Sequence, residues 1–194
     1  MGRRKKDGAL SHLESHEGDA VLRELLKRHP ELHQEAEEIA ESAISDVFVE
    51  GIAEDVSNSV LGVDLDDLNG RAGSHSWGYV EPSEAAWELL EEAVEDIIED
   101  MKRRKAAGSE AAAVKICLGM VLGLYTVRNT RNDGALGWVP DFPAETAGQA
   151  VSDFIELFPP SQRSDIANRL LEELRPHVGE WMEMLERVVQ RASA

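Results

Sequence analysis

The chain has 194 residues, of which 42% are hydrophobic and 30% are charged, and its formal net charge is −18. This apolar content argues against wholesale disorder, and the length suits one well-buried core. A surface so negative repels phosphate backbones, which argues against nucleic-acid binding through the main body. The one cysteine, Cys117, allows no internal disulfide, and its apolar neighbours predict a buried, reduced thiol.

The first residues are basic, with Arg3 to Lys6 in a row, but no apolar segment follows them. The sequence therefore predicts neither a secretory signal nor a membrane anchor, and we expect a cytoplasmic protein. Residues 1–18 are predicted to form a mobile head, and residues 19–194 a single all-α domain. Apolar residues recur at spacings of three and four almost everywhere in this domain, and no stretch alternates as a strand would.

The first helices are predicted near residues 19–29, 30–44 and 46–61. Asp19 and Asp46 are candidate N-caps for the first and third of these helices, and Pro30 separates the first from the second. Residues 62–81 hold four glycines and are predicted to form a long loop with one short helical turn at Leu65–Asn69.

Pro82 is predicted to open a strong amphipathic helix that ends before Gly108. Its apolar face comprises Ala86, Leu90, Ala93, Val94, Ile97 and Met101. The basic residues 102–105 lie in its last turn, where cations complement the helix dipole without any ligand.

The next predicted helix, residues 110–128, is apolar nearly all round and should be the buried centre of the fold. Lys115 interrupts its apolar run, which is then too short for the roughly 20 residues that a bilayer requires. Gly119 and Gly123 have the GxxxG spacing that lets another helix approach closely.

After a second loop at residues 129–142, helices are predicted from Pro143 to about Phe158, from Pro159 to Arg175, and from Pro176 onward. The total is about eight helices. They are predicted to stack as antiparallel helical pairs, in an irregular bundle or a short array that resembles helical repeats in style.

Two junctions between a loop and a helix look alike. Trp77 is followed five residues later by Pro82, and Trp138 is followed five residues later by Pro143. Proline fixes the entering φ angle, and each tryptophan can fold over the first helical turn as an apolar lid. Trp87 and Trp181 each lie five residues after a proline and are predicted to start a buried helix face.

No catalytic or metal site is predicted, and no cofactor. Two histidine pairs have i, i+4 spacing, at residues 12 and 16 and at residues 29 and 33, but Pro30 puts His29 outside the second helix. Asp64, Asp66 and Asp67 do not fit a calcium loop and are predicted to cap a short turn. Carboxylate pairs such as Glu91 and Glu95 recur along the acidic helices and do not single out an acid and a base.

The function favoured by the sequence is that of a non-enzymatic scaffold or adaptor that binds another protein. The acidic half would steer a basic partner, and Trp77, Tyr79, Trp138 and Phe142 are the predicted partner-binding anchors. An acidic face that serves only solubility is the simpler alternative. A small-molecule or divalent-metal-dependent enzyme that uses the 62–81 loop, with Asp64, Asp66, Asp67 and His75, is the alternative from another class. Acidic mimicry of nucleic acid is a third.

Overall fold

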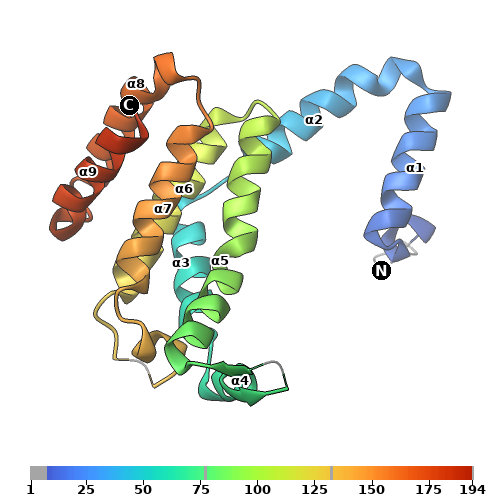
Figure 1. The fold of residues 1–194 in the computed structure, drawn as a ribbon. Coiled ribbons are helices and arrows are strands. Elements are labelled where there is room, and N and C mark those ends of the chain that lie inside the picture. Colours follow the sequence, from blue (N-terminus) through green and yellow to red (C-terminus); the bar gives the residue numbers. More distant parts are fainter. Residues whose placement is uncertain (1–7, 77, 132, 194) are drawn as a thin grey trace, which may run out of the picture. The chain divides into compact units, whose positions relative to one another are not determined.

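A computed structural model describes residues 8–76, 78–131 and 133–193 (Figure 1). Contacts within the chain divide it into two compact units, Met1–Ala43 and Ile44–Ala194, here called unit 1 and unit 2. The division therefore lies well beyond residue 18, where the sequence had suggested a boundary. Its physical reason is that the first two helices of the chain contain no buried residue and so contribute nothing to the core.

Unit 1 consists of short helices. They are η1 (Ala9–His12), α1 (Ser15–Arg28), η2 (Pro30–Leu32) and most of α2 (His33–Ser45), with η marking 3-10 turns. The helix α1 begins at Ser15 and not after Asp19, because Glu14 and Glu17 form a capping box there. The Glu17 carboxylate accepts a hydrogen bond from the backbone N–H of Glu14 at 3.0 Å.

Unit 2 is all-α, as predicted. Its elements are α3 (Val49–Gly62), α4 (Leu65–Arg71), β1 (Gly73–His75), β2 (Gly78–Val80), α5 (Pro82–Ala106), α6 (Glu110–Val127), η3 (Ala135–Trp138), α7 (Phe142–Glu156), α8 (Pro160–Leu174), η4 (Gly179–Trp181) and α9 (Met182–Ala192). The described residues thus form nine α-helices in all and one two-stranded sheet. The helix beyond the predicted eight is α4.

The predicted 62–81 loop is therefore mostly ordered structure. The Asp64 carboxylate accepts hydrogen bonds from the backbone N–H groups of Asp66 and Asp67, at 2.8 and 3.0 Å, which starts α4. The strands β1 and β2 then form an antiparallel hairpin in which Ser74 lies opposite Tyr79. The expectation that the three aspartates cap a short turn is confirmed for Asp64, the N-cap, and for Asp67, which completes the capping box.

Proline opens α5 at the predicted Pro82, and it opens α8 at Pro160, one residue after the predicted Pro159. Two predicted starts are wrong. The helix α3 begins at Val49 without a side-chain cap, so Asp46 does not serve as its N-cap. The helix α9 begins at Met182 and not at Pro176, because the backbone N–H groups of His177 and Val178 still bond to the Leu174 carbonyl and prolong the end of α8.

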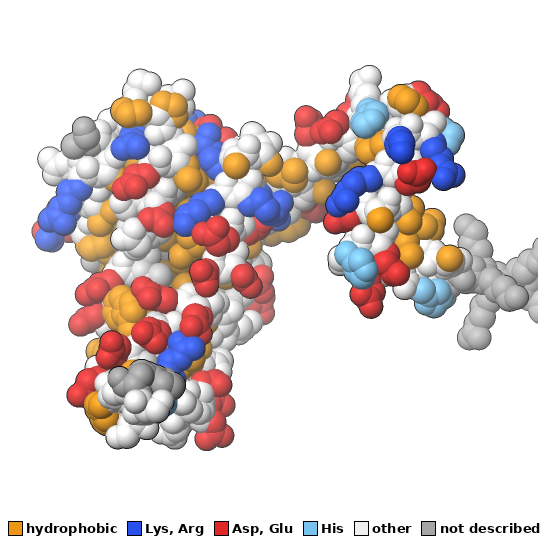
Figure 2. Space-filling view, turned by 45° about the vertical axis from the view of Figure 1, so that its right-hand side comes forward, with side chains coloured by type: hydrophobic (Ala, Val, Ile, Leu, Met, Phe, Trp, Pro, Cys, Tyr) orange, Lys and Arg blue, Asp and Glu red, His pale blue; other side chains and the backbone are white. Residues whose placement is uncertain are grey.

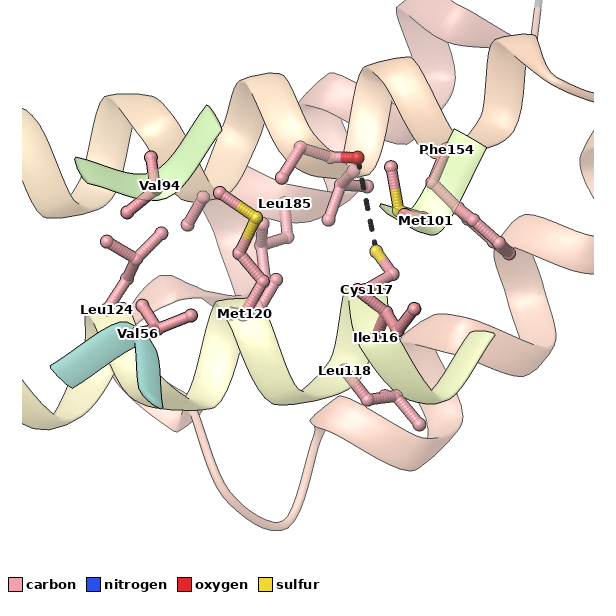
Figure 3. Packing of buried hydrophobic residues seen from close by; sticks show 14 of the residues in the cluster. Val56, Val94, Met101, Ile116, Cys117, Leu118, Met120, Leu124, Phe154 and Leu185 are labelled. Atoms are coloured by element: carbon pink, nitrogen blue, oxygen red, sulfur yellow. Dashed lines mark hydrogen bonds between the residues drawn. The ribbon is translucent and has the colours of Figure 1, made fainter. Parts of the chain in front are cut away.

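The buried centre of unit 2 is α6, as its all-round apolar sequence predicted. It packs against α3, α5, α7 and α8, and most of its side chains are buried (Figure 3). Among the described residues, α6 is also the one helix long and apolar enough to cross a membrane by length and composition. Cys117 lies fully buried in this core, where burial raises the pKa of its thiol, so it is unsuited to act as a nucleophile.

The face of α6 that carries Gly119 and Gly123 contacts α3 very closely. A Cβ atom added at Gly123 would lie 2.6 Å from the backbone oxygen of Ala53, and one at Gly119 would lie 2.6 Å from the Cβ of Ile52. Ser57 Oγ bridges the two helices by donating toward the carbonyl oxygens of Ala53 and Gly123 at 2.8 and 3.1 Å. The GxxxG spacing is therefore a close-packing device between the buried helix α6 and the apolar face of α3.

The basic end of α5 is neutralised within the fold. Lys102 pairs with Glu99, Arg103 and Arg104 both pair with Asp100, and Lys105 pairs with Glu110. Arg104 also donates to the backbone oxygen of Ile44, which ties α5 to the residue that begins unit 2. These contacts, together with the helix dipole, account for the cluster without a ligand.

We expect Asp100→Asn to lower the free energy of unfolding by about 1 kcal/mol at neutral pH. Burial raises the pKa of Asp100, but hydrogen bonds from Arg104 and Arg103 outweigh it, so the pKa lies below its ordinary value. A lowered pKa in the folded state stabilises the protein above the unfolded pKa of about 4, and this contribution is lost as the pH falls through the folded value. Denaturant unfolding should therefore show the two proteins converging at acidic pH. Asp96→Asn, at an exposed position on the same helix, is the control and should have no such effect.

Candidate functional site

The two similar junctions lie at the same end of unit 2. The helices α5 and α7 both begin there and run in the same direction, with the hairpin and η3 beside their first turns (Figure 1). The rings of Trp87 and Phe142 pack edge to face, with centroids 5.2 Å apart, and so join the two first turns. The repeated spacing of tryptophan and proline therefore marks two neighbouring parallel helices.

The four predicted anchors have different surroundings. Tyr79 in β2 and Trp138 in η3 are exposed, at 61% and 51% of their surface. Phe142 is fully buried beneath Trp87, so it belongs to the core and cannot contact a partner as predicted. Trp77 lies outside the described residues. The surface available for recognition at this end thus includes Tyr79 and Trp138.

The residues of the alternative enzyme hypothesis have structural partners. Asp64 and Asp67 bond to backbone N–H groups in the capping box of α4. His75 Nε2 lies 2.7 Å from the backbone oxygen of Arg71. Among the described residues, no group of three or more histidine, cysteine, aspartate or glutamate side chains is arranged to hold a metal ion.

A groove of about 530 Å³ lies along α5 and α7. Its apolar lining comes from Trp87, Val94 and Ile98 of α5. Acidic side chains surround this lining, and they are Glu88, Glu91, Glu92, Glu95 and Glu99 of α5 together with Glu145 and Asp153 of α7. We call this feature the acidic groove. In the space-filling view, acidic side chains gather over part of the visible face of unit 2 (Figure 2).

Each end of the acidic groove has a cation of its own. Arg71 donates two hydrogen bonds to Glu92, at 2.8 and 3.0 Å, and these lower the pKa of the Glu92 carboxyl. Lys102 lies 3.0 Å from Glu99 and 3.8 Å from Asp153, and its hydrogen bond to Glu99 raises the pKa of the amine. The carboxylates at both ends are therefore partly neutralised by the fold.

Three other carboxylates of the groove are not paired with either cation, although Lys102 also attracts Glu95 at longer range. Glu91, Glu95 and Glu145 form no ion pair with any residue that the structure describes. Glu91 and Glu95 are one helical turn apart on α5, and Glu145 comes from the first turn of α7. The groove thus combines an apolar floor with three carboxylates that form no ion pair, an arrangement that attracts a positively charged and partly apolar ligand.

The sequence did not predict this groove, although it did indicate the acidic character of α5. The contribution of Glu145 and Asp153 depends on α7 lying beside α5, which no local pattern specifies. The similar junctions before Pro82 and Pro143 were the available signal, because equivalent starts place the two helices side by side.

The fold and the groove define an all-α helical bundle with an acidic surface groove. The chain matches no known family model, no curated protein and no solved structure.

Proposed function

We propose that this protein is a non-enzymatic binding module that holds a basic, amphipathic segment of another protein in the acidic groove. The single observation that carries the proposal is that Glu91, Glu95 and Glu145 line the groove beside its apolar floor and form no ion pair with any described residue. A ligand with lysine or arginine beside apolar side chains would satisfy both the charge and the apolar surface.

The groove favours a helical ligand. Glu88, Glu91, Glu95 and Glu99 follow one another at spacings of three and four residues along α5. They extend over about 17 Å of helix axis, which matches a partner helix of about three turns. An amphipathic helix presents its apolar stripe and its flanking cations with the same period, so its charges and those of α5 can face one another in register.

Tyr79 and Trp138 extend this surface at the end where α5 and α7 begin. Both side chains are more than half exposed, and η3 packs directly against α5. Exposed tyrosine and tryptophan are frequent binding hot spots, since each offers a large apolar area at low entropic cost. In this proposal the groove binds the charged, helical part of the partner, and the two aromatic side chains contact the residues next to it.

The test uses a fluorescently labelled synthetic peptide of about 16 residues with an amphipathic lysine and leucine pattern, and a scrambled peptide of the same composition. We expect the amphipathic peptide to bind more tightly, with an affinity that falls as salt is added. Glu91→Gln, Glu95→Gln and Glu145→Gln together should weaken binding roughly tenfold or more, which corresponds to about 1.4 kcal/mol.

The matched control changes the charge by the same amount elsewhere in unit 2. Asp165→Asn, Glu172→Gln and Glu173→Gln lie on exposed positions of α8, away from the groove. These three changes together should leave the affinity within about twofold of the parent, because exposed charges at that distance are screened. Equal losses in both triple variants, or equal binding of the scrambled peptide, would contradict a specific groove.

A further inference from the structure

The helices of unit 1 carry an apolar surface that is not buried within the unit itself. No residue of η1, α1 or η2 is buried, and none of α2 is. Small folding units of about 40 residues usually need a metal, disulfides or association with another chain, because they bury too little surface alone. Unit 1 contains no cysteine, and among its described residues no metal-binding group is found.

The clearest apolar surface lies on α1. Val21, Leu22 and Leu25 are exposed at 43%, 48% and 43% of their surface, and Leu26 is partly exposed beside them. Their spacing places the four side chains on one face of the helix. Hydrophobic side chains are visible on the surface of this unit in Figure 2. A continuous apolar stripe on an exposed helix is the usual sign of a helix-pairing surface.

The charges of α1 are divided between its two ends. Glu14, Glu17 and Asp19 lie at the start, whereas Arg23, Lys27 and Arg28 lie at the end. The one acid in the second half, Glu24, bonds to Arg28 at 2.7 Å. Within the described residues, Asp19, Arg23 and Lys27 form no ion pair and no side-chain hydrogen bond, so they are available to another chain.

This distribution of charge favours a second copy of α1 as the partner, in antiparallel orientation. If a second copy of α1 lies antiparallel on the apolar stripe, the acidic start of each helix faces the basic end of the other. Because the stripe is centred between residues 23 and 24, this arrangement brings Asp19 of each copy level with Lys27 of the second copy. A parallel pair would align acidic starts with acidic starts and basic ends with basic ends.

We propose that the protein self-associates through an antiparallel pair of α1 helices, with Val21, Leu22, Leu25 and Leu26 at the interface and Asp19 level with Lys27 of the second copy. A single helix pair buries less than a standard interface, so the expected dissociation constant is on the order of 10–100 μM. This inference is independent of the acidic groove, which lies entirely in unit 2.

Analytical ultracentrifugation of the full chain across this concentration range is the first test. The parent protein should change from monomer to dimer, and Leu22→Gln with Leu25→Gln should remain a monomer throughout. Leu65→Gln, which changes an exposed leucine in unit 2, is the matched control and should dimerise as the parent does. Since α1 contributes no buried residue, the melting temperature of unit 2 should stay the same in all variants, and an unchanged helix content by circular dichroism excludes unfolding of α1 as the cause.

Charge-reversal variants test whether the two α1 helices pair in antiparallel orientation. Asp19→Lys alone and Lys27→Glu alone should each weaken dimerisation about tenfold, because each places like charges level with one another. An equimolar mixture should restore it to within about twofold of the parent, since both contacts of the mixed dimer then join opposite charges. A parent protein that stays monomeric at all concentrations, or dimerisation that survives the double leucine change, would overturn the proposal. If the mixture dimerised as weakly as each variant alone, the antiparallel arrangement would be wrong.

Discussion

Gly123→Ala is expected to lower the free energy of unfolding by about 2 kcal/mol, although alanine is the better helix former. The new Cβ atom would lie 2.6 Å from the backbone oxygen of Ala53 and 2.7 Å from the Cβ of Val56. Neither is the movable end of a long side chain, so the helices α3 and α6 must separate. Overpacking of this kind costs about 1–3 kcal/mol and sometimes more, against a propensity gain of about 1 kcal/mol.

The control for this prediction is Gly51→Ala, in α3 itself. A Cβ atom there would meet only the Cβ of Phe48, at 4.0 Å, which is an ordinary contact. This substitution should stabilise the protein by about 0.5–1 kcal/mol through helix propensity alone. Urea unfolding followed by circular dichroism measures both variants. If Gly123→Ala and Gly51→Ala raised the free energy of unfolding equally, the close approach of α3 to α6 would not exist in solution.

Phe142→Ala is expected to have the largest effect of any single change discussed, a loss of about 3–5 kcal/mol in the free energy of unfolding. Phe142 is fully buried, and its ring packs against Trp87 at the point where α5 and α7 begin. Removing it leaves a cavity that two rigid helix starts cannot easily close. Thermal and denaturant unfolding should both show the loss.

Trp138→Ala, compared with Phe142→Ala, tests whether Trp138 is a contact residue or part of the core. This side chain is half exposed, so its removal should cost about 1 kcal/mol or less, in contrast to the larger loss expected for a buried lid. Binding of the basic amphipathic peptide should instead become weaker while the melting temperature stays nearly constant. A loss of several kcal/mol in Trp138→Ala would show that it is a lid over the core and not a contact residue.

The sequence predicted the helical part of the fold well where the periodicity was strong. The apolar face of α5 and the all-round apolar α6 were both identified, because a period of 3.6 residues and an unbroken apolar run are local signals. The GxxxG spacing also predicted close packing of α6, but not which helix approaches it. That partner, α3, is distant in the chain, and only the fold brings Ile52 and Ala53 to the glycines.

Errors in the sequence predictions arose where tertiary contacts outweigh local rules. Asp19 and Asp46 are good capping residues, but the helices begin elsewhere, at Ser15 and Val49. Phe142 follows a polar loop and resembles an exposed anchor in sequence, yet the neighbouring α5 covers it with Trp87. The same pairing of α5 with α7 creates the acidic groove, so the site and this error have a common cause.

The close packing of α6 on α3 also has a consequence for the order of folding during synthesis. The apolar face of α3, with Val56 and Val60, is complete once residue 62 has been made, but its cover, α6, begins only at Glu110. The helix α4, the hairpin and the whole of α5 must be synthesised in between. A ribosome-bound chain that ends before α6 therefore exposes the very surfaces that the finished protein packs most tightly, and native packing begins only when the glycine face emerges.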